Sequence, residues 1–179
     1  MPSIPTTPDF WSGFYAGVFA SIIAFALAVF WDIWKSWRAD EKRDKAVITG
    51  IQHQLEDNIR IAAENAQTLN EEIGALKDGQ IVAHSLAPFD MSMRALVAVG
   101  IPSCFTRDAE AFDKFRKIVF STNQLNEDFR SRQAYKDGYQ HPKGDPYYLL
   151  RRLGQLDPSL LNRINELQAV MADLRNRIR

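Results

Sequence analysis

Cysteine is almost absent from this sequence, and long stretches of its first half lack proline or glycine; each absence excludes a class of structure. A single cysteine, Cys104, among 179 residues cannot form an intramolecular disulfide, which fits a reducing compartment. Proline is absent between Pro8 and Pro88, and glycine is absent between Gly17 and Gly50, so no common helix breaker interrupts this stretch. We therefore expect one helix to run a long way from the N-terminus.

Charge is also absent from one stretch, the run from Phe10 to Trp31 (FWSGFYAGVFASIIAFALAVFW). A hydrocarbon layer about 30 Å thick needs about 20 helical residues, so this run is long enough to cross a bilayer. Indole rings favour the zone between lipid and water, and every Trp of the protein lies at the edges of the run. We interpret residues 10–34 as a transmembrane helix with four interfacial anchors: Trp11, Trp31, Trp34 and Trp37.

Two alternatives for this run remain open. A cleaved signal peptide would have a basic tail before a shorter apolar run and a polar cleavage region after it, whereas the tail MPSIPTTPD has no Lys or Arg. The central helix of a soluble core would not sort its Trp residues to two edges. A membrane span accounts for the length of the apolar run, for the Trp residues at its two edges and for the lack of Lys and Arg in the tail before it, so we favour this interpretation.

The distribution of basic residues predicts an orientation. All 22 Lys and Arg residues follow the run, while the tail before it carries only Asp9. By the positive-inside rule, the N-terminus should lie outside and the body in the cytoplasm, at the inner membrane if the chain is bacterial. The expected divisions are a tail at 1–9, the span at 10–34, a basic juxtamembrane segment at 35–47 and a helical body at 48–179. The residues expected to contact lipid headgroups are Lys35, Arg38, Lys42, Arg43 and Lys45.

Beyond the basic segment, apolar residues recur mostly at steps of three and four. This spacing keeps a narrow apolar stripe on one side of a helix, which is typical of a coiled-coil seam or a bundle contact. Charged residues, among them Glu64 and Glu72, are expected on the opposite faces. The predicted seam consists of Ile48, Ile51, Leu55, Ile59, Leu69, Ile73 and Leu76.

The rest of the body also reads as helical, since alternation of period two is never sustained. We expect an all-α fold in which the transmembrane helix continues into a cytosolic bundle of about four to five antiparallel helices with coiled-coil-like seams. The predicted elements are a short helix from Pro88 to Val99, one capped by Thr106 that runs to about Ala134, a loop from Tyr135 to Pro146, a brief helix over 147–153 and a last helix starting at Asp157 and Pro158.

No sequence motif brings catalytic groups together. The phosphate-binding loop and the Gly-x-Ser-x-Gly elbow are absent, and His53 and Glu56 stand in the reverse order of the Glu-x-x-His pair of di-metal bundles. A nuclease-like helical enzyme remains a weak alternative, because Arg132 and His141 lie further apart than such sites require. We predict no catalytic, metal-binding or cofactor-binding residue. With 22 acidic residues balancing 22 basic ones, we expect no nucleic-acid partner.

The functional prediction depends on the span. Its small residues fall on one helical face, and Gly-x-x-x-Gly is a close-packing pattern of transmembrane dimers. We therefore expect a membrane-anchored interaction module that binds itself or a co-encoded protein partner. The alternative is an oligomeric effector that permeabilises the bilayer, against which the absence of charge in the span counts. The predicted packing face consists of Gly13, Gly17, Ser21, Ala24 and Ala28.

Replacing Gly13 and Gly17 together by Ile tests the packing face. The bulky side chains should keep two helices apart, so the particle mass of the full-length chain in detergent should fall. Light scattering with correction for bound detergent measures this mass, and the same change at Val18 and Val29, outside the face, is the control. A particle mass equal to that of the unaltered chain would contradict the predicted packing face.

Overall fold

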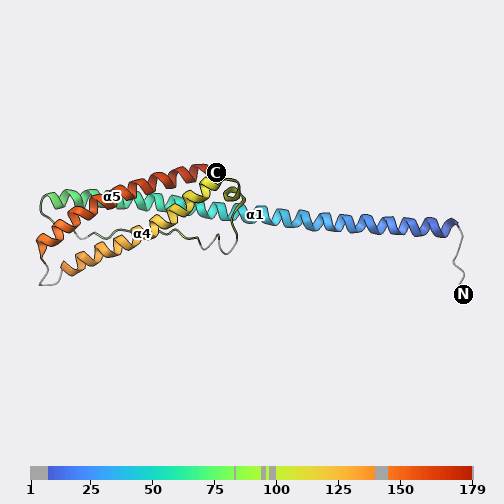
Figure 1. The fold of residues 1–179 in the computed structure, drawn as a ribbon, viewed down its shortest axis with the longest axis horizontal. Coiled ribbons are helices and arrows are strands. Elements are labelled where there is room, and N and C mark those ends of the chain that lie inside the picture. Colours follow the sequence, from blue (N-terminus) through green and yellow to red (C-terminus); the bar gives the residue numbers. More distant parts are fainter. Residues whose placement is uncertain (1–7, 83, 94–95, 97–99, 140–144, 179) are drawn as a thin grey trace. The chain divides into compact units, whose positions relative to one another are not determined.

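The computed structural model describes residues 8–82, 84–93, 96, 100–139 and 145–178, with side chains from residue 15 onward except that of residue 139. All regular secondary structure in these ranges is helical, which confirms the all-α prediction. The helices are α1 (Pro8–Lys77), α3 (Ser103–Arg107), α4 (Ala109–Tyr139) and α5 (Pro146–Arg177) (Figure 1). The chain divides into two compact units, residues 1–45 and 46–179, and α1 contributes to both.

Helix α1 ends at Lys77, and a glycine in the left-handed conformation follows two residues later. Gly79 has φ of 72°, and the N–H of Gln80 donates to the carbonyl of Ala75 at 2.9 Å. This arrangement satisfies carbonyls that the end of a helix leaves free, and glycine adopts it without strain from a Cβ atom. The turn at Lys77 to Gln80 therefore has a clear local cause.

The second unit is built around one apolar core shared by α1, α4 and α5 (Figure 1). On each helix the buried positions recur at steps of three and four, which places them on one face. Burying one such side chain contributes about 1.5–3 kcal/mol. The buried apolar residues of α4 and α5 include Phe115, Ile118, Leu125, Phe129, Leu160, Ile164, Leu167, Met171 and Leu174.

The start of α4 differs from the sequence prediction. Thr106 does not cap it, because Thr106 lies inside α3 and its hydroxyl donates to the carbonyl of Ser103. Asp108 occupies the capping position instead, and its carboxylate accepts the N–H of Ala111 at 3.0 Å. An acceptor there satisfies one of the free N–H groups of the first turn.

The C-terminal half of the unit has fewer breaks than predicted. Helix α4 continues past Ala134 to Tyr139, and α5 is one helix that contains Pro158. The predicted helix start at Asp157 is wrong because the Asp157 carboxylate binds Arg132 across the core. Pro158 removes only the hydrogen bond that its missing N–H would have given to the carbonyl of Gly154. Residues 140–144 of the predicted loop lie outside the described residues.

The short helix predicted from Pro88 to Val99 is also wrong over residues 88–93, which are not helical. Residues 84–93 instead form an extended segment along α1 and α4, and residues 94–95 and 97–99 lie outside the described residues. The segment buries Phe89 and Met91 in the core. Figure 1 shows this connection running beside the helices rather than coiling into one of its own.

Side-chain amides satisfy the backbone of this extended segment. Asn65 accepts the N–H of Ala87 at 2.8 Å and donates to the carbonyl of the same residue at 2.8 Å. Asn58 makes the same pair of bonds with Asp90, at 2.9 and 2.8 Å. Each amide therefore supplies the donor and the acceptor that a neighbouring strand would supply in a sheet.

The contacts from α1 follow a regular register. Glu72 accepts the N–H of His84 at 3.1 Å, so residues 58, 65 and 72 of α1 meet residues 90, 87 and 84 of the segment. Seven helical residues rise about 10.5 Å, and three residues of an extended chain of the polyproline type span about 9 Å. Every seventh residue of α1 is therefore placed to bind every third residue of the segment.

From the other side, Asn126 of α4 makes the equivalent pair of bonds with Phe89. Its amide accepts the Phe89 N–H at 2.8 Å and donates to the Phe89 carbonyl at 2.9 Å. The extended segment is thus fixed through its main chain to two helices. Backbone groups buried in this way would be costly without such partners.

Replacing Asn65 by Ala tests this anchoring. The change leaves the N–H and carbonyl of Ala87 without partners in a part-buried site, so the free energy of unfolding should fall by about 1–3 kcal/mol. Asn70 lies exposed on the same helix, and Asn70→Ala is the matched control. Denaturant titration of the full-length chain, followed by circular dichroism, measures both; equal midpoints would contradict the structural role of Asn65.

Candidate functional site

The first candidate is the apolar part of α1, which lies exposed in a single copy of the chain. None of its most apolar stretch is buried; Phe25, for example, is 72% exposed. By length and composition this is one helix able to cross a membrane, and a signal sequence passes the same test. A core helix of a soluble domain would bury most of its apolar residues, and this stretch does not.

The predicted packing face has one described polar group, the hydroxyl of Ser21. It donates to the carbonyl of Gly17, one turn earlier, at 2.9 Å, so its hydrogen bond is satisfied within the helix. A Cβ atom at Gly17 would meet no other atom of this chain within 4 Å. The absence of a side chain at Gly17 is therefore not needed for packing inside one copy. Gly13 belongs to α1, but its exposure lies outside the description. Ala24 and Ala28 are exposed.

The predicted anchors on the C-terminal side of the run cluster along one helix. The rings of Trp31 and Trp34 lie 5.1 Å apart, and the guanidinium carbon of Arg38 stands 4.0 Å from the centre of the Trp34 ring. This is the geometry of a cation–π contact. Trp37 is exposed, and the side chain of Trp11 lies outside the described residues.

The other predicted headgroup contacts lie on the exposed surface of α1. Lys45 forms an ion pair with Glu41 at 2.8 Å, one turn earlier. Lys35, Lys42 and Arg43 are exposed. These cations follow the Trp31–Trp34 pair along the same helix, and the farthest of them, Lys45, lies about three turns beyond Trp34.

The predicted seam of α1 faces the interior of the second unit. Ile51, Leu55 and Leu69 are buried, and the remaining four, Ile48, Ile59, Ile73 and Leu76, are partly buried. Polar residues share the buried face: Asn58, Asn65 and Glu72. The prediction that Glu72 lies on an outer face is wrong, because its carboxylate serves a buried ion cluster.

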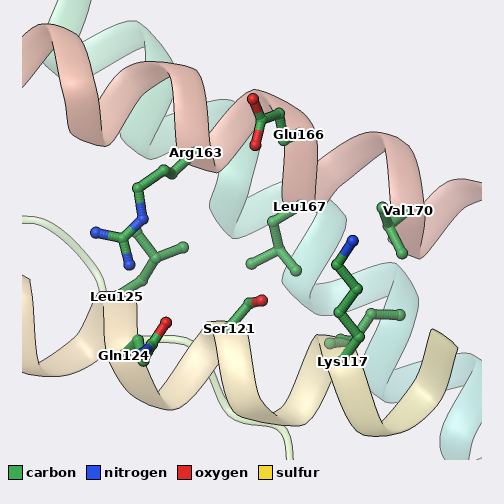
Figure 2. A pocket seen from close by; sticks show the side chains of 9 residues that line it. Lys117, Ser121, Gln124, Leu125, Arg163, Glu166, Leu167 and Val170 are labelled. Carbon is green, nitrogen blue, oxygen red and sulfur yellow. The ribbon is translucent and has the colours of Figure 1, made fainter. Parts of the chain in front are cut away.

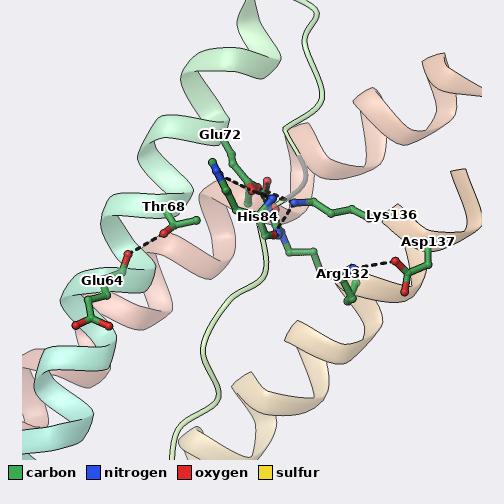
Figure 3. Close-up of polar contacts among 9 residues, drawn as sticks. Glu64, Thr68, Glu72, His84, Arg132, Lys136 and Asp137 are labelled. Carbon is green, nitrogen blue, oxygen red and sulfur yellow. Dashed lines mark hydrogen bonds and ion pairs between the residues drawn. The ribbon is translucent and has the colours of Figure 1, made fainter. Parts of the chain in front are cut away.

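This ion cluster joins α1, α4, α5 and the extended segment (Figure 3). Arg132 is 2% exposed, and its guanidinium donates to Asp157 at 2.6 and 2.9 Å and to Glu72. Lys136 donates to both Glu72 oxygens, at 2.9 and 3.1 Å, and to the carbonyl of His84 at 2.9 Å. Two cations and two carboxylates thus meet inside the protein.

Burial is the main cause that changes the pKa of Lys136. It lowers the pKa to about 8, the positive charge of Arg132 acts in the same direction, and the negative charge of Asp157 opposes them. Because the value stays above 7, Lys136 still carries its proton at neutral pH. The two cations then balance the two carboxylates, which is the condition for burying charges at acceptable cost.

The cluster lacks the features of a catalytic centre. Its ammonium and guanidinium groups are occupied by carboxylates and by the His84 carbonyl, so they are not free to bind a substrate. Among the described residues, no three His, Cys, Asp or Glu side chains stand close enough to hold a metal ion. Arg132 of the nuclease-like alternative is committed to this cluster, and His141 lies outside the described residues. We read the cluster as a structural lock between four chain segments.

A hollow between α4 and α5 is the second place considered (Figure 2). Lys117 and Arg163 stand on opposite sides of it, with Ser121 between them. Arg163 is bound to Asp128 at 2.5 Å. The hollow encloses about 120 Å³, whereas small-molecule sites usually enclose about 300–1,000 Å³. It is too small for an organic ligand of ordinary size.

Sequence reasoning missed the polar residues on the buried face of α1. Their signal is present in the sequence, since Asn58, Asn65 and Glu72 recur every seventh residue between the apolar seam positions. A polar residue in a repeating core position usually specifies a particular arrangement of chains. The partner of the repeat could not be read from sequence, because the sequence predicts a helix from Pro88 to Val99 where residues 88–93 are extended.

Comparison with protein-family models, with curated proteins and with solved structures gave no match in any of the three. The functional argument therefore rests on the residues and their contacts alone.

Replacing Arg132 by Met tests the lock. The change leaves the Asp157 carboxylate buried without its cation, which should lower the free energy of unfolding by about 3–5 kcal/mol. Arg130→Met is the matched control, because the Arg130 side chain is 74% exposed and, within the described residues, pairs only with Glu127. Denaturation midpoints by circular dichroism compare the two variants.

A double variant, Arg132→Met with Asp157→Leu, shows whether Arg132→Met destabilises the fold because Asp157 loses its cation or because the Arg132 side chain no longer packs. It removes the orphaned carboxylate, so it should be more stable than Arg132→Met alone. If Arg132→Met unfolded no more easily than Arg130→Met, the lock would not hold the segments together.

Proposed function

We propose that the chain is a single-pass, membrane-anchored helical interaction module. Residues 10–34 cross the bilayer, the N-terminus lies outside, and the helical unit from Ala46 onward lies in the cytoplasm. The unit binds a second copy of the chain or a protein partner encoded beside it. The proposal includes no catalytic step, no cofactor and no nucleic acid.

The observation that carries the proposal is the exposure of the apolar stretch of α1. Phe19, Phe25 and Phe30 are each more than 60% exposed in the single chain. Water would penalise this surface by roughly 25 cal/mol for each Å² of apolar area, so a stable chain needs something apolar to cover it. Lipid covers such a helix without any further protein, which makes the bilayer the simplest partner.

The edges of the stretch support the same assignment. The Trp31 and Trp34 rings, which lie close together at a tilt, and the Arg38 guanidinium provide an apolar surface with a charged edge, which suits the headgroup zone. Basic side chains next to an anionic leaflet each contribute about 1 kcal/mol of attraction. The positive charge on this side also supports the cytoplasmic location of the helical unit.

Self-association within the membrane follows from the small-residue face. Gly17 and the internally bonded Ser21 leave a smooth, close-approach surface that one copy does not use. Helices in lipid associate through van der Waals packing at such surfaces. The second unit, in contrast, has already closed its own apolar seam and does not need a second copy to fold.

Fractionation of cells that express the full-length chain tests the anchor. The chain should stay in the membrane pellet after washing with alkaline carbonate, because an apolar span of this length is not released by charge screening. A matched variant carries Phe19→Lys, Ile23→Glu and Phe30→Lys and should move to the supernatant. A full-length chain that washes off and remains monodisperse without detergent would defeat the proposal.

Two further measurements test the orientation of the chain in the membrane and whether it makes the bilayer leak. A protease added to inverted membrane vesicles should remove a C-terminal tag, whereas one added to intact cells should not. Dye retained in liposomes that contain the purified chain favours an anchor, and dye released from them favours the permeabilising alternative.

A further inference from the structure

The outer face of α4 carries an apolar side chain that the fold does not use. Phe120 is 62% exposed, while its neighbours Ile118 and Thr122 point into the core. A large aromatic ring on a helix surface is a common anchor of protein contacts when it stands beside a hollow. Phe120 meets this condition, because it borders an open hollow on the same face.

The hollow is formed by α4 together with the end of the extended segment. Val119 and Met93, both partly buried, supply its apolar surface beside Phe120. It is a shallow, open depression of about 590 Å³, so an aromatic ring can lie against it without being enclosed. The face therefore offers both a projecting ring and a place where another ring could lie.

Charges of both signs surround the ring. Asp113 and Arg116, about two turns and one turn before Phe120, form an ion pair at 3.7 Å. Lys117 makes no hydrogen bond or ion pair with any of the described residues. A surface that holds an anchor, a hollow, an acidic group and basic groups side by side is complementary to itself. A twofold contact uses the same patch on both subunits and requires this property.

We propose that the surface formed by Met93, Asp113, Lys117, Val119 and Phe120 is a twofold contact with a second copy of the chain. Phe120 of each copy packs over Met93 and Val119 of the other, and Lys117 of each copy faces Asp113 of the other. The inference deepens the proposed self-association by naming a second contact outside the span. Phe120, Asp113 and Lys117 are exposed on this face in a single copy.

Disulfide cross-linking in native membranes tests the contact. Cys104 is first replaced by Ala in the full-length chain, and Phe120→Cys is then compared with Asn165→Cys, an exposed position on α5. Under mild oxidation the Phe120→Cys chain should form a dimer about tenfold faster than the Asn165→Cys chain. Equal rates, or cross-linking of Phe120→Cys to a protein of another mass, would overturn the proposal.

A charge exchange supplies a test that does not depend on cysteine. Asp113→Lys should weaken self-association by about tenfold, because it places like charges opposite each other, and adding Lys117→Asp should restore it. All these residues are outside the core, so circular dichroism should be unchanged. A double variant as weak as Asp113→Lys alone would refute the Asp113–Lys117 arrangement.

The outcomes distinguish a failure of the Phe120 contact from a failure of the membrane anchor. A chain that stays in carbonate-washed membranes but cross-links equally at both positions retains the anchor and loses the Phe120 contact. A chain found in the supernatant that still cross-links fastest at residue 120 loses the anchor and retains the contact.

Discussion

The second unit depends on one constraint, which is that a non-helical segment buried among helices must have its main-chain groups paired. In a sheet a neighbouring strand would supply these pairs, but the described part of the chain contains only helices around the segment. Asn58, Asn65 and Asn126 solve the problem with side-chain amides, each holding both groups of one residue. The position of the extended segment follows from this pairing, and so does the spacing of the helices on either side of it.

The ion cluster extends the same register to the end of α1. Glu72 takes the place that the next Asn would occupy, and it accepts the N–H of His84. A carboxylate there can also bind cations, and Arg132 and Lys136 of α4 reach it. Arg132 then binds Asp157, which brings in α5. Buried charges of this kind add little net stability compared with apolar residues of the same size, and their best-attested role is to specify one arrangement of chain segments.

Much of the helical architecture could be predicted from the sequence because its causes are local. The length of α1 follows from the absence of Pro between Pro8 and Pro88, and the buried face of α5 follows from apolar residues at steps of three and four. The extended segment could not be predicted, because the groups that stabilise it lie 22 to 37 residues away in the sequence. Asp157 shows the same limit, since its role is decided by Arg132 on another helix rather than by its own neighbours.

The closed interior also limits where copies of the chain can meet. The face of α1 from Ile51 to Glu72 is buried against other parts of the same copy, so it cannot also join two copies without unfolding the unit. Among the described residues, the surfaces left exposed include the small-residue face of the apolar stretch and the Phe120 patch. Close packing in lipid favours contact through the first surface, and removal of apolar area from water favours contact through the second.

A contact centred on one aromatic ring is weak between free proteins, but two chains already held together in a membrane meet at a high effective concentration. A weak second contact is then sufficient, and either contact alone would give an association that depends strongly on how much of the chain is present.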